Sequence, residues 1–287
     1  MWNPFNRNTI SNSSASKRSL QLITQKGMPF AYVEAYKALR TNLNFLSGSG
    51  DVHAFVVTST VPEEAKSNVS VNLALALTES GKKVVLVDCD LRKPILHRYL
   101  KAGHNLKGVS NVLSRQVALS DALVELKDIS NLTFLPAGTT PPNPSELLSQ
   151  PQMQEMVDTL RGSYDFVILD APPISMVTDA AVIGRIVDGA LFVVRSKYAS
   201  TDAVKTALEK LQDAGVKVLG AVLTRYDAKK SLKRSDYGYG YYYYNSNYSY
   251  GPPPDGISES AAKKSGLTSK KQHNGKEKHS VHTEDET

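Results

Sequence analysis

The sequence has almost no cysteine and no long apolar segment, and each absence excludes a class of protein. Its 287 residues contain one cysteine, Cys89, so a disulfide framework is excluded and a reducing cytoplasm is expected. No apolar run approaches the roughly 20 residues of a membrane-spanning helix. Residues 1–19 are polar and lack the apolar core of a signal peptide. We therefore expect a cytoplasmic protein with one large domain and tails.

The positive charge lies mainly near the two ends of the chain. The formal net charge is +6, and lysines recur through the last 25 or so residues. Basic ends favour an anionic neighbour, such as a membrane surface or a nucleic acid. Solvated, disordered termini explain the same pattern.

Between residues 54 and 224, short apolar runs alternate with amphipathic stretches. Val69–Ser80 and Thr201–Ala214 have helical periodicity and are each followed by glycine. Residues 31–45 also look helical. Continuous apolar strands between helices predict an α/β fold, a mostly parallel sheet with helices on both faces. The predicted strands are 54–59, 83–88, 132–138, 166–173, 189–194 and 216–224.

Composition divides the chain into four parts. Residues 1–28 are predicted to be a flexible lead, and residues 29–232 the α/β domain. The tyrosine-rich part spans 233–251, and a disordered basic tail spans 252–287.

Eight of the 14 tyrosines lie within residues 237–250, YGYGYYYYNSNYSY. The Gly, Asn and Ser spacers do not build a core. Tyrosine hydroxyls accept phosphoryl groups, and phosphorylation of the whole segment would add a large negative charge. A low-complexity aromatic tract is the alternative interpretation. The candidate phosphoacceptors are Tyr237, Tyr239, Tyr241, Tyr242, Tyr243, Tyr244, Tyr248 and Tyr250.

The first predicted strand is followed by TVPEEAKSN, residues 60–68, and then by a helix. A strand, a tight loop ending in Lys-Ser and a helix form the layout of a P-loop. Lys66 would reach the terminal phosphates, and the Ser67 hydroxyl would bind Mg²⁺. The loop lacks the usual glycines, whose places Glu63 and Ala65 take. An ordinary turn with Ser67 as a helix cap is the alternative.

Three carboxylates follow predicted strands. Asp88 and Asp90 end one strand two residues apart, and Asp170 ends another after four apolar residues. The carboxyl ends of parallel strands meet at one edge of a sheet. Mg²⁺ prefers oxygen ligands, so these residues beside a Lys-Ser loop predict a site for ATP and Mg²⁺.

Several longer motifs resemble the bacterial tyrosine kinases of capsule and exopolysaccharide synthesis, the BY-kinase family. The resemblance covers residues 28–250 and implies a P-loop NTPase fold and a cytoplasmic kinase whose transmembrane activator is a separate polypeptide. The motifs are EAYKALRTN (34–42), DCDLRKP (88–94), LPAGTTPPNPSELL (135–148), YDFVILDAPPISMVTD (164–179), DGALFVVR (188–195) and the tyrosine cluster.

The resemblance also implies roles for individual residues. Asp90 is implied as the base that takes the proton of the acceptor tyrosine, with Lys66 and Arg92 beside the phosphates as the other catalytic residues. The implied metal ligands are Ser67, Asp88 and Asp170.

The chain departs from the family in its phosphate loop, which usually reads Pro-Gly-Glu-Gly-Lys-Ser-Thr. A left-handed backbone at Ala65 would cost about 1–2 kcal/mol. We therefore expect ATP to bind roughly ten- to a hundredfold more weakly than to the family loop. Thr224 stands where the family has a base-contacting Asn. The implied nucleotide-binding residues are Pro62, Glu63, Glu64, Ala65, Lys66, Ser67, Asn68 and Thr224.

The family's oligomerisation motif falls on Glu34, Lys37 and Arg40, which a helix places on one face. Lys37 replaces an arginine and loses its planar fork. We expect a homo-oligomeric ring that assembles more weakly than in relatives.

Three hypotheses follow for the function. The first is an ATP-dependent tyrosine kinase that phosphorylates its own cluster and regulates polysaccharide synthesis and export. The second is a pseudokinase scaffold of the same pathway, and the third a partition-type ATPase, although Val61 stands where those enzymes carry a second lysine. For the kinase, the expected partners are a transmembrane activator at the inner face of the membrane, further copies of the chain and a tyrosine phosphatase, but no nucleic acid.

Overall fold

The computed structural model describes residues 21–48 and 52–226. All of them belong to one compact unit, Met1–Lys233. The predicted tyrosine cluster and basic tail lie outside the described residues, as do residues 1–20.

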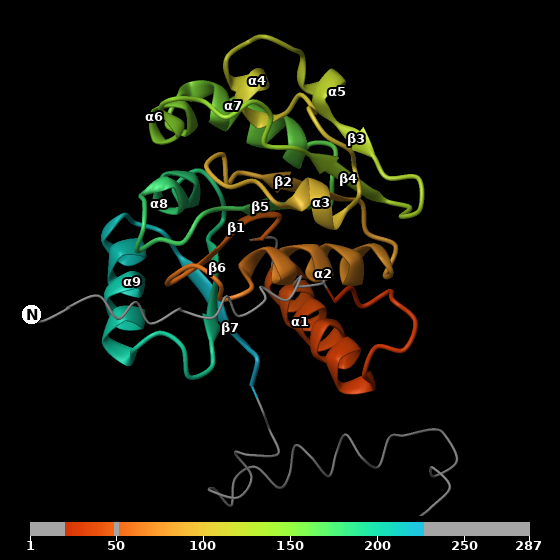
Figure 1. The fold of residues 1–287 in the computed structure, drawn as a ribbon, viewed down its shortest axis with the longest axis vertical. Coiled ribbons are helices and arrows are strands. Elements are labelled where there is room, and N and C mark those ends of the chain that lie inside the picture. Colours follow the sequence, from red (N-terminus) through yellow and green to blue (C-terminus); the bar gives the residue numbers. More distant parts are fainter. Residues whose placement is uncertain (1–20, 49–51, 227–287) are drawn as a thin grey trace, which may run out of the picture. The chain divides into compact units, whose positions relative to one another are not determined.

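The described residues form a seven-stranded sheet with the order β3-β4-β2-β5-β1-β6-β7 (Figure 1). Neighbouring strands are parallel, except that β3 runs antiparallel to β4. This confirms the predicted fold class. The strands are β1 (Ala54–Ser59), β2 (Val84–Asp88), β3 (Val124–Glu125), β4 (Leu132–Leu135), β5 (Phe166–Asp170), β6 (Ala190–Arg195) and β7 (Val218–Thr224).

Helices cover both faces of the sheet, because the central strands are apolar on both sides. Every residue of β1, β2 and β5 is buried. One apolar cluster joins the sheet to α1 and α2, and a second joins it to the helices on the other face (Figure 1). The helices are α1 (Phe30–Gly48), α2 (Lys66–Thr78), α3 (Leu96–Tyr99), α4 (Val109–Leu113), α5 (Leu119–Ala122), α6 (Pro144–Leu148), α7 (Pro151–Arg161), α8 (Asp179–Gly184) and α9 (Thr201–Asp213).

Part of the predicted flexible lead is packed against α2. Ile23 is buried, and its N–H donates to Oδ1 of Asn72 over 2.8 Å. The carbonyl oxygen of Gln21 accepts hydrogen bonds from the Tyr32 hydroxyl and from Nδ2 of Asn72. The domain therefore begins before residue 29, because the buried side chain of Ile23 and the hydrogen bonds with Asn72 and Tyr32 fix this segment.

The register of the parallel strands brings the acidic strand ends together. Asp170 of β5 lies opposite Val57 of β1 on one side and Asp88 of β2 on the other. The loop after β1 and the two carboxylates therefore share the carboxyl edge of the sheet. Among the described helices, none is both long and apolar enough to cross a membrane.

Candidate nucleotide and metal site

The loop between β1 and α2 adopts a glycine-type backbone without containing glycine. Glu63 has φ of 68° and Ala65 has φ of 72°, both in the left-handed region. These are the two positions where the loop Pro-Gly-Glu-Gly-Lys-Ser-Thr of the resembled family has glycine. The conformation predicted for Ala65 is thus present, and Glu63 shares it. Each left-handed residue costs about 1–2 kcal/mol, which the surrounding contacts must offset.

Hydrogen bonds accepted by Glu64 stabilise the conformation of this loop. Its buried carboxylate accepts hydrogen bonds from the N–H of Val61 at 2.9 Å and of Arg195 at 3.2 Å. Its carbonyl oxygen accepts one from the Thr224 hydroxyl at 2.9 Å. The guanidinium of Arg195 donates to the carbonyl of Glu63. The ends of β6 and β7 therefore brace the loop, a role that sequence reasoning did not assign to Glu64 or Thr224.

Lys66 opens α2 and points at two carboxylates. Its Nζ lies 3.2 Å from Oδ2 of Asp90 and 3.2 Å from Oδ2 of Asp170. Burial alone would lower the pKa of Lys66, but the charges of Asp170 and Asp90 more than offset it, and the pKa is raised. Lys66 therefore stays a cation, as a phosphate-binding lysine must.

Asp170 is the centre of the hydrogen-bond network. It accepts from the Ser67 hydroxyl at 2.6 Å and from the Ser70 hydroxyl at 3.0 Å, in addition to Lys66. Burial raises the pKa of Asp170, while Lys66 and Ser67 oppose the shift. Two predicted metal ligands, Ser67 and Asp170, are thus in direct contact.

Asp88 ends β2 beside this network. Its carboxylate accepts hydrogen bonds from the N–H groups of Asp90 and Leu96. Burial, followed by the charge of Asp170, raises the pKa of Asp88 to about 8. Two buried carboxylates that repel each other are the arrangement that a divalent cation stabilises.

The residues fit Mg²⁺ as a partial ligand set. Among the described residues, no three His, Cys, Asp or Glu side chains form a metal cluster. Mg²⁺ commonly binds one or two carboxylates and completes its shell with phosphate and water oxygens. Ser67, Asp88 and Asp170 are suited to that mode.

Arg92 is bound to a different carboxylate. Its Nε lies 3.0 Å from Oδ2 of Asp179, and its Nη2 donates to the Ser145 hydroxyl at 2.8 Å. Ser145 itself donates to Asp179, which is fully buried at the start of α8. The hydrogen bond that Arg92 donates to Asp179 is the main reason that the pKa of Arg92 is raised. Arg92 thus ties the loop after β2 to α6 and α8, and its role at the phosphates stays a prediction.

Two further residues predicted to bind the nucleotide, Asn68 and Pro62, have different surroundings. Oδ1 of Asn68 accepts hydrogen bonds from the Tyr32 hydroxyl at 3.0 Å and the Tyr36 hydroxyl at 3.1 Å. Asn68 therefore links α2 to α1, and its contact with the nucleotide stays a prediction. Pro62 is exposed in the loop.

The three residues of the predicted oligomerisation motif are partly exposed on α1 and have different partners. Lys37 pairs with Glu34 at 2.8 Å. Arg40 instead donates to the carbonyl oxygen of Ala76 on α2, also at 2.8 Å. The guanidinium of Arg40 thus contacts α2 while the residue stays partly exposed, and the oligomerisation role of the three residues remains a prediction.

The strand, the tight loop, the helix opened by Lys-Ser and the acidic strand ends define a P-loop NTPase of the α/β class. A family model described as an AAA domain matches residues 64–218. The chain is 37% identical over 205 residues to Tyrosine-protein kinase YwqD of Bacillus subtilis, which covers 71% of this chain and 84% of that protein.

Solved structures agree with this class. The chimerical protein CapA2B2 matches with a TM-score of 0.66 and 35% identity, over 71% of this chain and 88% of that one. The septum site-determining protein MinD from Pyrococcus horikoshii OT3, complexed with Mg-ADP, matches with a TM-score of 0.54 and 25% identity, over 64% and 72% of the two chains. The chain belongs to the bacterial tyrosine-protein kinase family of capsule and exopolysaccharide synthesis.

Proposed function

We propose that this protein transfers the γ-phosphoryl group of Mg-ATP to tyrosine hydroxyls, and that residues 237–250 of a neighbouring copy are its main acceptors. One observation carries the proposal: Lys66 lies within 3.2 Å of both Asp90 and Asp170 at the carboxyl edge of the sheet. A cation, a metal-ligand pair and a candidate base thus converge where P-loop enzymes hold phosphates. Membership of a tyrosine kinase family gives the acceptor class.

In this mechanism Lys66 changes partners when the nucleotide binds. Its ammonium turns to the phosphates, which frees the carboxylate of Asp90 to accept a proton. The tyrosine oxygen then bonds to the γ-phosphorus while the bond to the bridging oxygen of ADP breaks, and the phenolic proton passes to Asp90. Bound Mg²⁺ supplies charge neutralisation, and Ser67, Asp170 and Asp88 are the residues that would hold it.

The proposal extends to regulation of polysaccharide synthesis. Each phosphotyrosine adds a charge of about −1.5 to −2, so a cluster phosphorylated at most of its tyrosines would repel its neighbours and release a ring of subunits. A transmembrane activator would recruit the chain to the inner face of the membrane, and a tyrosine phosphatase would reset the cluster. The family assignment supports this pathway.

A non-catalytic scaffold is the second candidate function. The observation that favours it is the pair of left-handed residues, Glu63 and Ala65, in a loop that normally relies on glycine. If this strain prevents nucleotide binding, the chain would keep the fold and the partners of a kinase without turnover.

Mixing two full-length variants tests the proposed kinase function. One variant carries Asp90→Asn and intact tyrosines; the other is active and has all eight cluster tyrosines changed to Phe. With Mg-ATP, phosphotyrosine should appear on the Asp90→Asn chain and map to residues 237–250. Absence of label there, when wild type labels itself, would show that transfer does not occur between subunits; no label in either case would favour the scaffold.

A further inference from the structure

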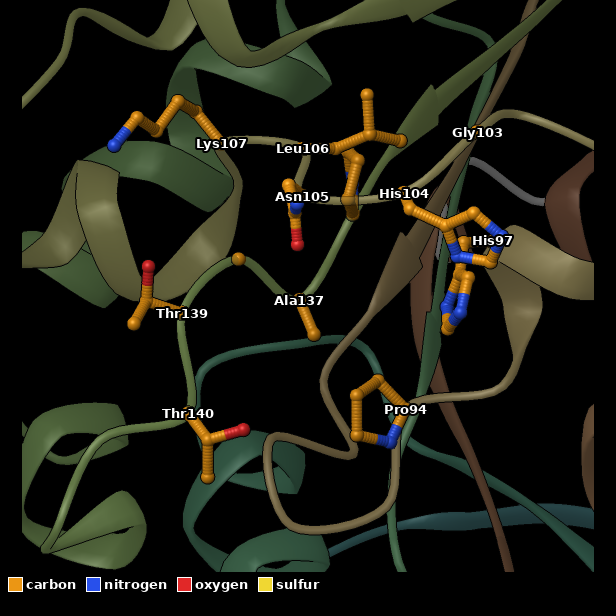
Figure 2. Close-up of a pocket in the computed structure, with 12 residues that line it drawn as sticks. Pro94, His97, Gly103, His104, Asn105, Leu106, Lys107, Ala137, Thr139 and Thr140 are labelled. Atoms are coloured by element: carbon orange, nitrogen blue, oxygen red, sulfur yellow. The ribbon is translucent and has the colours of Figure 1, made fainter.

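A cavity of about 550 Å³ lies at the carboxyl ends of β2 and β4, next to the loop that carries Asp90. Figure 2 shows the imidazole rings of His97 and His104 on one side and Thr139 and Thr140 on the other. Asn105 and Lys107 also line it. Among the described residues that line this cavity none is acidic, so its surroundings favour an anionic or neutral polar ligand.

The wall of the cavity is built by two loops in close contact. A Cβ added at Gly108 would lie 1.9 Å from the carbonyl oxygen of Pro136. The N–H of Val109 donates to that same oxygen at 2.8 Å. Oδ1 of Asn111 accepts from the N–H groups of Gly108 and Thr139. Only glycine permits this approach, and the cavity is therefore a formed feature of the fold.

One buried polar atom beside the cavity lacks a partner. Oγ of Ser110 is buried and makes no hydrogen bond in the part of the chain that the structure describes. It lies against Gly138, a lining residue, since a Cβ added there would be 2.6 Å from this oxygen. Buried hydroxyls are normally hydrogen-bonded; Ser110 is not itself a lining residue, so this unpaired oxygen lies behind the wall that Gly138 forms.

The cavity is near the proposed base. Oδ1 of Asp90 accepts a hydrogen bond from the N–H of Lys93 at 3.0 Å, and the next residue, Pro94, lines the cavity. Residues two apart in an extended peptide are roughly 6.6 Å apart. Tyr237, Tyr239 and Tyr241 have this spacing in the sequence, and side chains two residues apart point to the same side of an extended peptide.

We propose that this cavity binds a phosphotyrosine of the acceptor peptide, beside the tyrosine that is about to react. This inference rests on the proposed kinase function. It adds that the tyrosines of one cluster are phosphorylated in sequence, because each phosphotyrosine held in the cavity promotes transfer to the next tyrosine. Lys107 is the one lysine or arginine among the described lining residues; its amine points outward in Figure 2 and would turn inward to meet a phosphate of about −1.5 to −2. Burial, with the nearby Arg98 and His104, lowers the pKa of His97 in the unliganded protein, and this ring is a hydrogen-bonding group on the wall of the cavity. The volume lies within the range of roughly 300–1,000 Å³ of ligand pockets.

Binding without ATP tests this independently of turnover. The protein is the full chain with the eight cluster tyrosines changed to Phe, so that its own cluster does not compete. The probes are fluorescent peptides of residues 237–250, unmodified or phosphorylated at the position of Tyr241. We expect the phosphopeptide to bind about tenfold more tightly, as hydrogen bonds to a charged group commonly allow.

Lys107→Glu should remove that preference, and the milder Lys107→Ala should reduce it. Lys107 is exposed, so neither change threatens folding. Lys205→Glu, an equally exposed lysine on α9, is the matched control and should keep the preference. Equal binding of both peptides to the parent protein, or an unchanged preference in Lys107→Glu, would overturn the inference.

Adding Mg-ATP separates this inference from the proposed function. Transfer to both peptides with equal kcat/KM and equal affinity would overturn the cavity assignment and leave the kinase function standing. A binding preference without any transfer would support the cavity and overturn the kinase function.

Discussion

Nζ of Lys66 lies 3.2 Å from Oδ2 of Asp170, although 104 residues separate them in the chain. The parallel register of β1 and β5 creates this contact, because it brings the loop after β1 to the end of β5. Asp170 is fully buried and Lys66 nearly so. Each buried charge is stabilised by the other. If nucleotide binding draws Lys66 away from Asp170, the phosphates must supply an equally close negative charge for the Lys66 ammonium.

Restoring glycine to the phosphate loop should tighten nucleotide binding. Glu63→Gly with Ala65→Gly removes two left-handed non-glycine residues, each of which costs about 1–2 kcal/mol. We expect ATP to bind roughly ten- to a hundredfold more tightly, measured by titration calorimetry. The backbone contacts from Arg195 and Thr224 are retained, since both go to carbonyl oxygens. Equal affinity of the two proteins would mean that the strain does not limit binding.

Asn68→Thr, which introduces the residue common in the family, should destabilise this chain. The shorter hydroxyl cannot serve both Tyr32 and Tyr36, and the Tyr36 side chain is buried. The expected loss is about 1–3 kcal/mol of unfolding free energy, measured in urea. In a Tyr32→Phe, Tyr36→Phe background the same change should cost clearly less; an equal cost would show that the network does not stabilise Asn68.

Glu34→Ala with Lys37→Ala tests the oligomerisation face without disturbing the fold. The pair is partly exposed on α1, so its removal should change the unfolding free energy by less than about 1 kcal/mol. Light scattering should show a smaller assembly and autophosphorylation should fall. Arg40→Ala is the contrast, because it also loses the contact with Ala76. An unchanged mass of the assembly in the double variant would show that Glu34 and Lys37 are solvated side chains that make no contact between subunits.

Asp188 should make the protein sensitive to acid. Burial alone raises the pKa of Asp188, but the N–H groups of Ala54 and His53 and the guanidinium of Arg161 outweigh it, and the pKa is lowered. A depressed folded pKa gives stability that is present above the unfolded value near 4 and is lost as pH falls through the folded value. Asp188→Asn should therefore cost about 1–3 kcal/mol at pH 7.

The same variant should show a flatter loss of stability below pH 4, measured by urea unfolding from pH 7 to pH 2. Asp213→Asn, on the exposed face of α9, is the control and should follow wild type. A pH dependence in Asp188→Asn as steep as in wild type would assign the acid sensitivity to other carboxylates.

Sequence alone predicted the parts of the fold that depend on continuous apolar runs. Strands β1, β2 and β5 were predicted because buried parallel strands are apolar on both faces, and Asp88 and Asp170 because polar residues end those runs. Strand β3 was missed, since two half-exposed residues carry no periodic signal.

Long-range polar contacts could not be predicted in this way. The pairing of Arg92 with Asp179 spans 87 residues and joins the loop after β2 to the first residue of α8, with no regular spacing between them. Asn68 was assigned to the nucleotide by its place in a motif, whereas its partners lie on a helix that precedes the motif in sequence. The hydrogen bonds that the buried carboxylate of Glu64 accepts within and beside its own loop were likewise not predicted, and the place of Glu64 at the nucleotide stays a prediction.

The most direct test is the rate of phosphotyrosine formation by the purified full chain with Mg-ATP, compared with Asp90→Asn. Loss of a positioned general base lowers a rate by about 10²–10⁴-fold, and Asp90→Asn should fall in that range. Lys66 keeps its partner Asp170 in this variant, so the unfolding free energy should stay within about 1 kcal/mol of wild type. Phosphorylation of the Asp90→Asn chain at the wild-type rate would contradict the assignment of Asp90 as the base.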